Sequence, residues 1–312
     1  MGKSTVREGA DTMSRYVWLL VAAGTIGCAE STTAPQASPR LHDHIVFTSN
    51  RSGEDEFYRM KPDGSEVHVI PTPGVDGLAQ SSISPDGEWL AFAGIDDFVG
   101  YDIFVMRVDG SELQNLTDVP VYQEHPAWSP DGSRIAYSEN LGGNANDTDL
   151  FVMDRDGSNR QRLTQSPGHD TDPSWAPDGS AITFQSDRDG QFEIYVLPLG
   201  GSTPVRITQH PDGDVSPQWS PDGSTIMFVR FQSGSNSGIY LMNPDGTNVR
   251  QVPLAFQADS RGGIAWSPDG TRIIVTEESV FDIWTMRPDG SEAVRLTDSP
   301  NVLDLHPVWS PK

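Results

Sequence analysis

Short runs of mixed apolar and polar residues, each closed by a turn sequence, recur along most of the chain. One repeat shows the pattern clearly in residues 126–129, 134–137, 149–153 and 161–164, where β-branched and aromatic residues are frequent. Pro-Asp-Gly follows the first run and Asp-Gly follows the third. Proline pre-sets φ, aspartate bonds its own backbone and glycine accepts a positive φ, so both sequences are turns. The pattern predicts four short antiparallel strands in each repeat.

The repeat returns with a nearly constant period. The proline of its first turn recurs at spacings of 45, 47, 44, 47 and 43 residues, as Pro85, Pro130, Pro177, Pro221, Pro268 and Pro311. Four-stranded repeats of this length are typical of propeller blades. We therefore predict an all-β protein, a six-bladed β-propeller of four-stranded antiparallel blades. Residues 44–47 read as a second strand and residues 306–312 as a first strand, so we expect the C-terminal strand to close the first blade.

The N-terminal residues have a different character. Residues 17–27 are apolar or small, which is too short a run to span a bilayer but suits the core of a signal peptide. The run ends in Thr25-Ile26-Gly27-Cys28, which resembles a bacterial lipobox and contains the only cysteine of the chain. We predict a signal peptide over residues 1–27, a lipidated Cys28 at the start of a flexible tether over 28–43, and the propeller over 44–312. The alternative is an ordinary export signal with an incidental cysteine.

The repeat also resembles a known family. Residues 128–133 read Trp-Ser-Pro-Asp-Gly-Ser before an apolar strand, and residues 239–246 read Ile-Tyr-Leu-Met-Asn-Pro-Asp-Gly. These motifs are similar to the TolB-type propeller repeat over about residues 44–312. The resemblance implies a periplasmic propeller that binds other envelope proteins and is not an enzyme, whereas other relatives use such propellers as gates beside a peptidase domain or as lyases. We recognise no counterpart of the TolB α/β domain in residues 1–43, so a role in the Tol–Pal system does not follow.

Charge separates the two faces of the predicted ring. The formal net charge is −23, without a cluster of lysine and arginine that would grip nucleic acid. The loops between second and third strands differ from repeat to repeat, as in residues 94–102, 139–149, 186–193 and 230–238. Together with the connections between repeats they form what we call the loop face; the opposite turn face carries the Pro-Asp-Gly and Asp-Gly turns. Most of the excess acid falls on the loop face, where binding function is commonly found.

The position five residues before each turn proline is expected to surround the mouth of the central channel. It reads Gln80, His125, Asp172, Ser216, Gly263 and His306. We predict that the acidic mouth attracts a basic segment of a protein or peptide partner, or a divalent cation, although no compact metal-ligand spacing is present. The candidate partner-binding residues are Gln80, His125, Asp170, Asp172, Asp214, Asp304 and His306. An alternative explanation of the recurring Asp102, Asp149, Glu193 and Asp282 is a role in the fold.

The sequence contains none of the common catalytic motifs, such as Gly-x-Ser-x-Gly or His-Glu-x-x-His. We predict a bacterial envelope protein that binds a protein or peptide, without nucleic acid and without a required cofactor. We expect a monomer that meets the membrane only through its lipid anchor. The alternative is a small envelope lyase or hydrolase that uses His125, His306, Asp172 and a bound metal at the channel mouth. Tryptophans beside the turns are expected to pack between blades, namely Trp128, Trp175, Trp219, Trp266 and Trp309.

Overall fold

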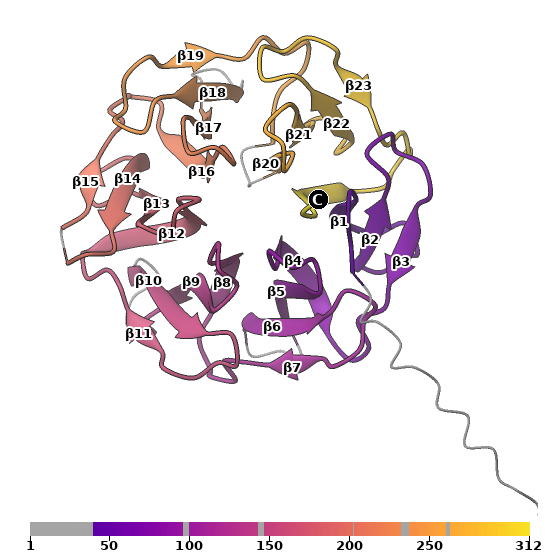
Figure 1. The fold of residues 1–312 in the computed structure, drawn as a ribbon, viewed down its shortest axis with the longest axis horizontal. Coiled ribbons are helices and arrows are strands. Elements are labelled where there is room, and N and C mark those ends of the chain that lie inside the picture. Colours follow the sequence, from indigo (N-terminus) through magenta and orange to yellow (C-terminus); the bar gives the residue numbers. More distant parts are fainter. Residues whose placement is uncertain (1–39, 96–99, 143–146, 202, 232–236, 260–262) are drawn as a thin grey trace, which may run out of the picture. The chain divides into compact units, whose positions relative to one another are not determined.

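The structure is a computed structural model that describes residues 40–95, 100–142, 147–201, 203–231, 237–259 and 263–312. The predicted signal peptide, Cys28 and residues 28–39 of the predicted tether lie outside the described residues. The described residues belong to one compact part of the chain, Ser38–Lys312. In this part the strands form sheets that surround a central axis (Figure 1).

Four sheets have four strands each, and in each the strand nearest the axis comes first in the pairing order (Figure 1). They are β24 (Asp304–Trp309), β1 (Ile45–Ser49), β2 (Glu56–Met60) and β3 (His68–Ile70); β4 (Asp76–Ile83), β5 (Trp89–Ile95), β6 (Asp102–Arg107) and β7 (Gln114–Asn115); β16 (Asp214–Trp219), β17 (Ile226–Arg230), β18 (Gly238–Met242) and β19 (Arg250–Gln251); and β20 (Ile264–Trp266), β21 (Ile273–Thr276), β22 (Ile283–Met286) and β23 (Val294–Arg295).

The remaining eight strands form one sheet. It contains β8 (Gln123–Trp128), β9 (Arg134–Asn140), β10 (Asp147–Asp154), β11 (Gln161–Arg162), β12 (Gly168–Trp175), β13 (Ala181–Ser186), β14 (Glu193–Pro198) and β15 (Val205–Arg206). Two antiparallel units, β8–β11 and β12–β15, are joined because the first residues of β10 and β12 pair in parallel, Asp147 with Gly168 and Thr148 with His169. The sequence predicted separate blades throughout, and this fusion corrects that prediction. Only four of the sheets are separate four-stranded sheets.

The two ends of the described chain meet in one sheet. Strand β24 pairs antiparallel with β1, with Trp309 opposite Ile45 and Asp304 opposite Ser49. The prediction that the C-terminal strand completes the first sheet is therefore confirmed. Leu41, which the sequence analysis placed in the tether, is fully buried and its N–H donates to the carbonyl of Gly87. The packed part thus begins before residue 44, because Leu41 contributes an apolar side chain to the core.

The predicted role of the tryptophans agrees with the packing. The indole N–H of Trp175 donates to the carbonyl of Ala127 at 3.0 Å, and that of Trp266 donates to the carbonyl of Gln218 at 3.3 Å. Each bond joins an inner strand to the inner strand of the preceding unit. Trp128 packs in a cluster that also contains Trp89 of the preceding unit. These side chains therefore hold neighbouring units together. The described residues include no helix with the length and apolarity needed to cross a membrane.

The low pKa values of the turn aspartates indicate how the free energy of unfolding depends on pH. Asp131 accepts hydrogen bonds from Ser129 Oγ at 2.6 Å, Ser133 Oγ at 2.8 Å and Ser133 N at 3.0 Å, which lower its pKa to about 2. A serine or threonine likewise lowers the pKa of Asp63, Asp109, Asp156, Asp178, Asp222, Asp245 and Asp289. A carboxyl with a lowered pKa in the folded state stabilises that state above its ordinary pKa and loses the contribution as the pH falls.

We therefore expect the free energy of unfolding to fall as the pH is lowered from about 4 to about 2. Glu139 and Asp149 act in the opposite direction, because burial raises the pKa of each. Urea denaturation at a series of pH values measures the balance. In the Asp131→Asn variant the slope over this interval should be smaller than in the wild type. An unfolding free energy that rises on acidification would contradict this prediction.

Candidate functional site: the channel mouth and its surroundings

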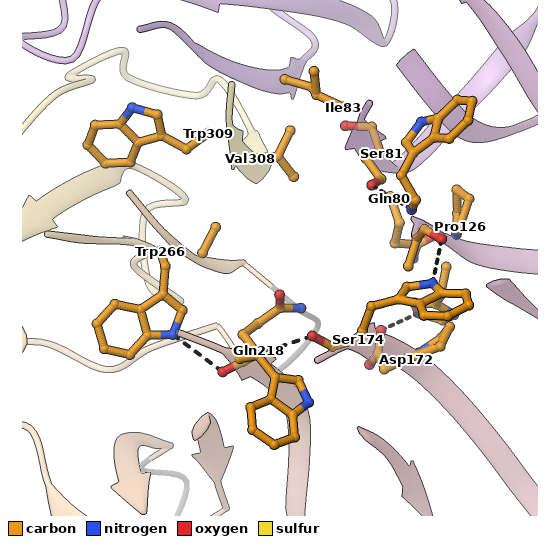
Figure 2. Close-up of a pocket in the computed structure, with 18 of the residues that line it drawn as sticks. Gln80, Ser81, Ile83, Pro126, Asp172, Ser174, Gln218, Trp266, Val308 and Trp309 are labelled. Carbon is orange, nitrogen blue, oxygen red and sulfur yellow. Dashed lines mark hydrogen bonds and ion pairs between the residues drawn. The ribbon is translucent and has the colours of Figure 1, made fainter. Parts of the chain in front are cut away.

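The six strands nearest the axis, β4, β8, β12, β16, β20 and β24, enclose a cavity of about 330 Å³. Figure 2 shows its lining. Tryptophans from five of these strands line it, namely Trp128, Trp175, Trp219, Trp266 and Trp309. The lining also contains polar side chains, among them Gln80, His125, Asp172, Ser216, Gln218 and His306, and smaller apolar ones such as Ile83, Ile264 and Val308.

Four of the predicted mouth residues share an unusual backbone conformation. His125, Asp172, Ser216 and His306 have φ values of 56°, 55°, 54° and 50°. In each strand the register with its neighbour shifts at this point, so the residue lies in a β-bulge. All four residues line the cavity, as does Gln80, whereas Gly263 is not among the lining residues. The spacing in the sequence therefore predicted which residues line the cavity. It did not predict the β-bulges in which four of these residues lie.

His125 is held between two partners. Its Nε2 lies 3.2 Å from Asp172 Oδ1, and its Nδ1 lies 3.1 Å from Ser138 Oγ. The hydroxyl of Ser138 also donates to the carbonyl of Glu124, which ties the ring to the backbone of its own strand. Asp172 Oδ2 also accepts from Ser216 Oγ at 3.4 Å, which extends the contacts to the next strand.

His306 is oriented in the same way as His125. Its Nδ1 lies 3.3 Å from Thr48 Oγ1, and the Thr48 hydroxyl donates to the carbonyl of Leu305. In both places a hydroxyl of the second strand fixes the ring. A serine, a histidine and an aspartate stand in line at His125, yet Ser138 is buried, with 2% of its surface exposed. Its proton is directed to a carbonyl, so the contact positions the ring and does not activate a nucleophile.

Three of the predicted mouth residues are elsewhere. Asp170, Asp214 and Asp304 are fully buried and do not line the cavity. Arg188 Nη2 lies 2.6 Å from Asp170, Arg230 Nε lies 2.6 Å from Asp214, and Arg51 Nη2 lies 2.8 Å from Asp304. Each guanidinium also stacks over two aromatic rings, which for Arg230 are Phe228 and Tyr240. The expectation that these acids surround the channel mouth is corrected, because burial and ion pairing assign them to the fold.

The recurring acids at the start of the third strands are also structural. Asp102, Asp149, Glu193 and Asp282 are buried, and each accepts a hydrogen bond from a threonine at the end of the same unit. The second interpretation given by the sequence, a role in the fold, therefore holds for these four residues. Among the residues that the structure describes, no three His, Cys, Asp or Glu side chains come close enough to hold a metal ion. The divalent cation at the channel mouth therefore stays a prediction.

An aromatic patch beside the mouth was missed by the sequence analysis. Tyr122 has 54% of its surface exposed, and its ring centroid lies 6.3 Å from that of Tyr101. Burial raises the pKa of Tyr101, and the negative charges of Glu124 and Asp55 raise it further. Two tyrosines and two carboxylates therefore share one region of the loop face. The available signal was the presence of large aromatic residues in connections rather than in strands.

The comparisons with known proteins agree with this architecture. The family model described as the Tricorn protease N-terminal beta propeller domain matches residues 145–280. An uncharacterized peptidase of Bacillus subtilis, YuxL, is 31% identical over 130 residues, which is 39% of this chain and 19% of the peptidase. The Tol-Pal system protein TolB of Anaeromyxobacter dehalogenans is 46% identical over 59 residues, which is 18% of this chain and 13% of TolB. The alignments thus span less than a fifth of these relatives.

Solved structures show the same fold. TolB from Acinetobacter baumannii superimposes with a TM-score of 0.73 at 21% identity, covering 88% of this chain and 68% of that one. A putative TolB from Agrobacterium tumefaciens gives a TM-score of 0.67 at 18% identity, covering 86% and 99%. An oligogalacturonate lyase in complex with manganese gives 0.59 at 14% identity, covering 81% and 73%. The chain therefore has a β-propeller fold that resembles TolB structures, and the fold alone is shared with an enzyme.

Proposed function

We propose that this protein is a six-bladed propeller of the bacterial envelope that binds a protein or peptide through its loop face. The eight-stranded sheet counts as two blades in this proposal, since each half has the strand order of a blade. The similarity to Tol-Pal system proteins supports an envelope location.

The lipobox-like sequence before Cys28 supports a lipid anchor. Labelling with a radioactive fatty acid tests this anchor. We expect the protein to take up the label and the Cys28→Ser variant to lose it.

The charge of the loop face carries the proposal. Its described arginines each form an ion pair with a buried acid, which neutralises their charge: Arg51, Arg188 and Arg230 from the loops, and Arg162, Arg206 and Arg295 from the outer strands. The two lysines that the structure describes, Lys61 and Lys312, lie at turns of the turn face. Of the exposed acids on the loop face, Asp189 pairs with Arg206 and Asp298 with Arg295. Four others have no ion pair within the described residues, namely Glu54, Asp55, Asp76 and Asp118. An excess of negative charge without neighbouring cations favours a partner with a basic segment.

The Tyr101–Tyr122 patch supplies a contact for such a partner. Tyrosine is enriched in protein interfaces because its ring gives a large contact area and its hydroxyl a hydrogen bond. Tyr122 is exposed, while Tyr101 beneath it is partly buried in a core cluster and so is held in place. Asp55 and Glu124 near the rings add attraction for a basic side chain. The patch on the units β4–β7 and β8–β11 and the polar side chains of the cavity are therefore the contacts that we propose for the partner.

The enzymatic alternative has less support from the residues. His125 and Asp172 do face each other in the cavity. However, the hydroxyl aligned with His125 is buried and bonded to a carbonyl, and Asp170 is fully buried against Arg188. The hydroxyl of Ser216 lies beside Asp172, but it bonds the carboxylate and Ser216 is only 2% exposed. The pair therefore serves best as a fixed polar element of the binding region.

Replacing Tyr122 with alanine is expected to weaken binding of a basic peptide about tenfold, because an exposed aromatic anchor is lost. Fluorescence anisotropy with a fluorescein-labelled peptide of alternating lysine and leucine measures this on the full chain. Val205→Ala is the matched control, since Val205 is equally exposed but lies on the outer strand β15. A peptide of alternating glutamate and leucine should not bind. Equal affinity for both peptides, or no change in Tyr122→Ala, would contradict the proposed function.

A further inference from the structure

Four units share a buried cluster on the loop face. An acid lies within two residues of the start of the third strand, an arginine or asparagine follows it by 13 residues, and a threonine follows it by 15 residues. Glu193 shows the geometry, since it accepts from Arg206 Nη2 at 2.8 Å and from Thr208 Oγ1 at 2.6 Å. The same positions are occupied in the other three units by Asp102, Asn115 and Thr117; by Asp149, Arg162 and Thr164; and by Asp282, Arg295 and Thr297.

The unit β16–β19 lacks this cluster. Gly238 stands at the position of the acid, Gln251 at that of the arginine and Pro253 at that of the threonine. Gly238 and Gln251 instead line a cavity of about 530 Å³. The unit β12–β15 has a cavity of about 480 Å³ at the matching place, lined there by Glu193 and Arg206. The substitutions in β16–β19 therefore remove the acid and the arginine from the lining and do not create the space. The unit β1–β3 also departs from the pattern, but there Glu56 keeps the acid and accepts from Tyr58.

The remaining wall of this cavity combines aromatic, apolar and acidic groups. Leu254, Ala255 and Phe256 come from the connection after β19, and Glu277 comes from the next unit. The ring of Phe256 stacks on that of Trp284 with centroids 4.8 Å apart. Glu277 accepts from Trp284 Nε1 at 2.9 Å and from Ser279 Oγ at 2.9 Å, so its carboxylate is fixed. An ionised carboxylate accepts about four hydrogen bonds, so Glu277 retains acceptor capacity.

We propose that this cavity receives an arginine side chain of the partner. The inference rests on the proposed function and names one site on the same face. The guanidinium takes the place of the arginine that the neighbouring units supply themselves, and Glu277 takes the place of the missing acid. The aliphatic part of the side chain packs against Leu254 and Phe256, as long cationic side chains do on apolar surface. Arginine fits better than lysine because its planar group stacks on aromatic rings and bonds a carboxylate through two N–H groups.

The probe is N-acetyl-arginine amide, and N-acetyl-citrulline amide is the matched control because it has the same shape without the charge. Nuclear magnetic resonance of the full chain with isotope-labelled tryptophan reports on the Trp284 indole N–H, which a Trp284→Phe variant assigns. We expect the arginine amide to shift this signal saturably and the citrulline amide to leave it unchanged. Glu277→Gln should weaken binding about tenfold, since a charge-assisted hydrogen bond is lost.

A second variant tests the correspondence between units. Gln251→Arg supplies the missing arginine at an exposed position, so it should fold normally and abolish the response to the arginine amide by filling the site. Glu292→Gln, an exposed acid on the turn face, should behave as the wild type. An unmoved Trp284 signal, or an equal response to citrulline amide, would overturn the inference.

The lysine–leucine peptide used above separates this inference from the proposed function. If that peptide binds the wild type and Trp284 does not respond to arginine amide, the arginine site is wrong and the proposed function stands. If Trp284 responds to arginine amide and the basic peptide does not bind, the cavity site stands and the proposed function of the face is wrong.

Discussion

Replacing Arg230 with alanine is expected to lower the free energy of unfolding by about 3–5 kcal/mol. The substitution leaves Asp214 without a partner inside the protein, because this carboxylate is fully buried and loses the two guanidinium bonds that it accepts at 2.6 and 2.8 Å. The cost of an uncompensated buried charge exceeds the loss of the attraction itself. The aromatic rings of Phe228 and Tyr240 also lose the guanidinium that lies over them. Urea denaturation, followed by tryptophan fluorescence, measures the change.

An exposed ion pair provides the control for Arg230→Ala. Arg287 lies 2.8 Å from Glu292 on the turn face, and about half of each side chain is exposed. Water screens this pair, so Arg287→Ala should cost less than about 1 kcal/mol. If both variants lost the same stability, the buried position of Asp214 would not be the cause. Removing both charges with Asp214→Leu and Arg230→Met should restore much of the loss, because no isolated charge then remains.

The sequence was sufficient to predict the propeller because the fold is repeated. Turns such as Pro130-Asp131-Gly132 occur at nearly constant spacing, and each copy predicts the same strands on its two sides. The fusion of β8–β11 with β12–β15 was not predictable in this way. It depends on a parallel pairing of Asp147 and Thr148 with residues of another repeat, and nothing in the local pattern indicates such a contact.

The site was predicted less well, for a physical reason. A repeat position shows which residues share a level in the ring, so it placed His125 and His306 at the cavity. Whether an acidic side chain can be buried depends on a cationic partner, and the partner's position in the chain does not follow from the repeat. Asp304 pairs with Arg51 from the opposite end of the chain. The sequence alone shows that Gly238 stands where other repeats have an acid. That difference could be interpreted only when the structure showed that Gly238 lines a cavity.

Replacing Gly246 with alanine is the second change with a large expected effect, about 2–5 kcal/mol of lost stability. Gly246 lies in the Asp-Gly turn between β18 and β19 with φ of +81°, a conformation that costs an L-residue about 1–2 kcal/mol. A Cβ there would also lie far inside contact distance of the carbonyl oxygen of Ile207 in the preceding unit. Ile207 cannot withdraw freely, because its N–H donates to the carbonyl of Ile194 at 2.9 Å. Relieving such an overlap typically costs a further 1–3 kcal/mol, to order of magnitude.

Gly179→Ala separates the two contributions to this loss. Gly179 has φ of +72°, but a Cβ added there meets no atom within 4 Å. The backbone term alone should therefore appear, at about 1–2 kcal/mol. Gly64, Gly110 and Gly290 make the same close approach to a preceding unit as Gly246, so alanine at these positions should also be costly. Thermal and urea denaturation of the variants measure these losses of stability. Equal losses for Gly246→Ala and Gly179→Ala would mean that the turns do not press on their neighbours, and glycine would then serve only the turn conformation.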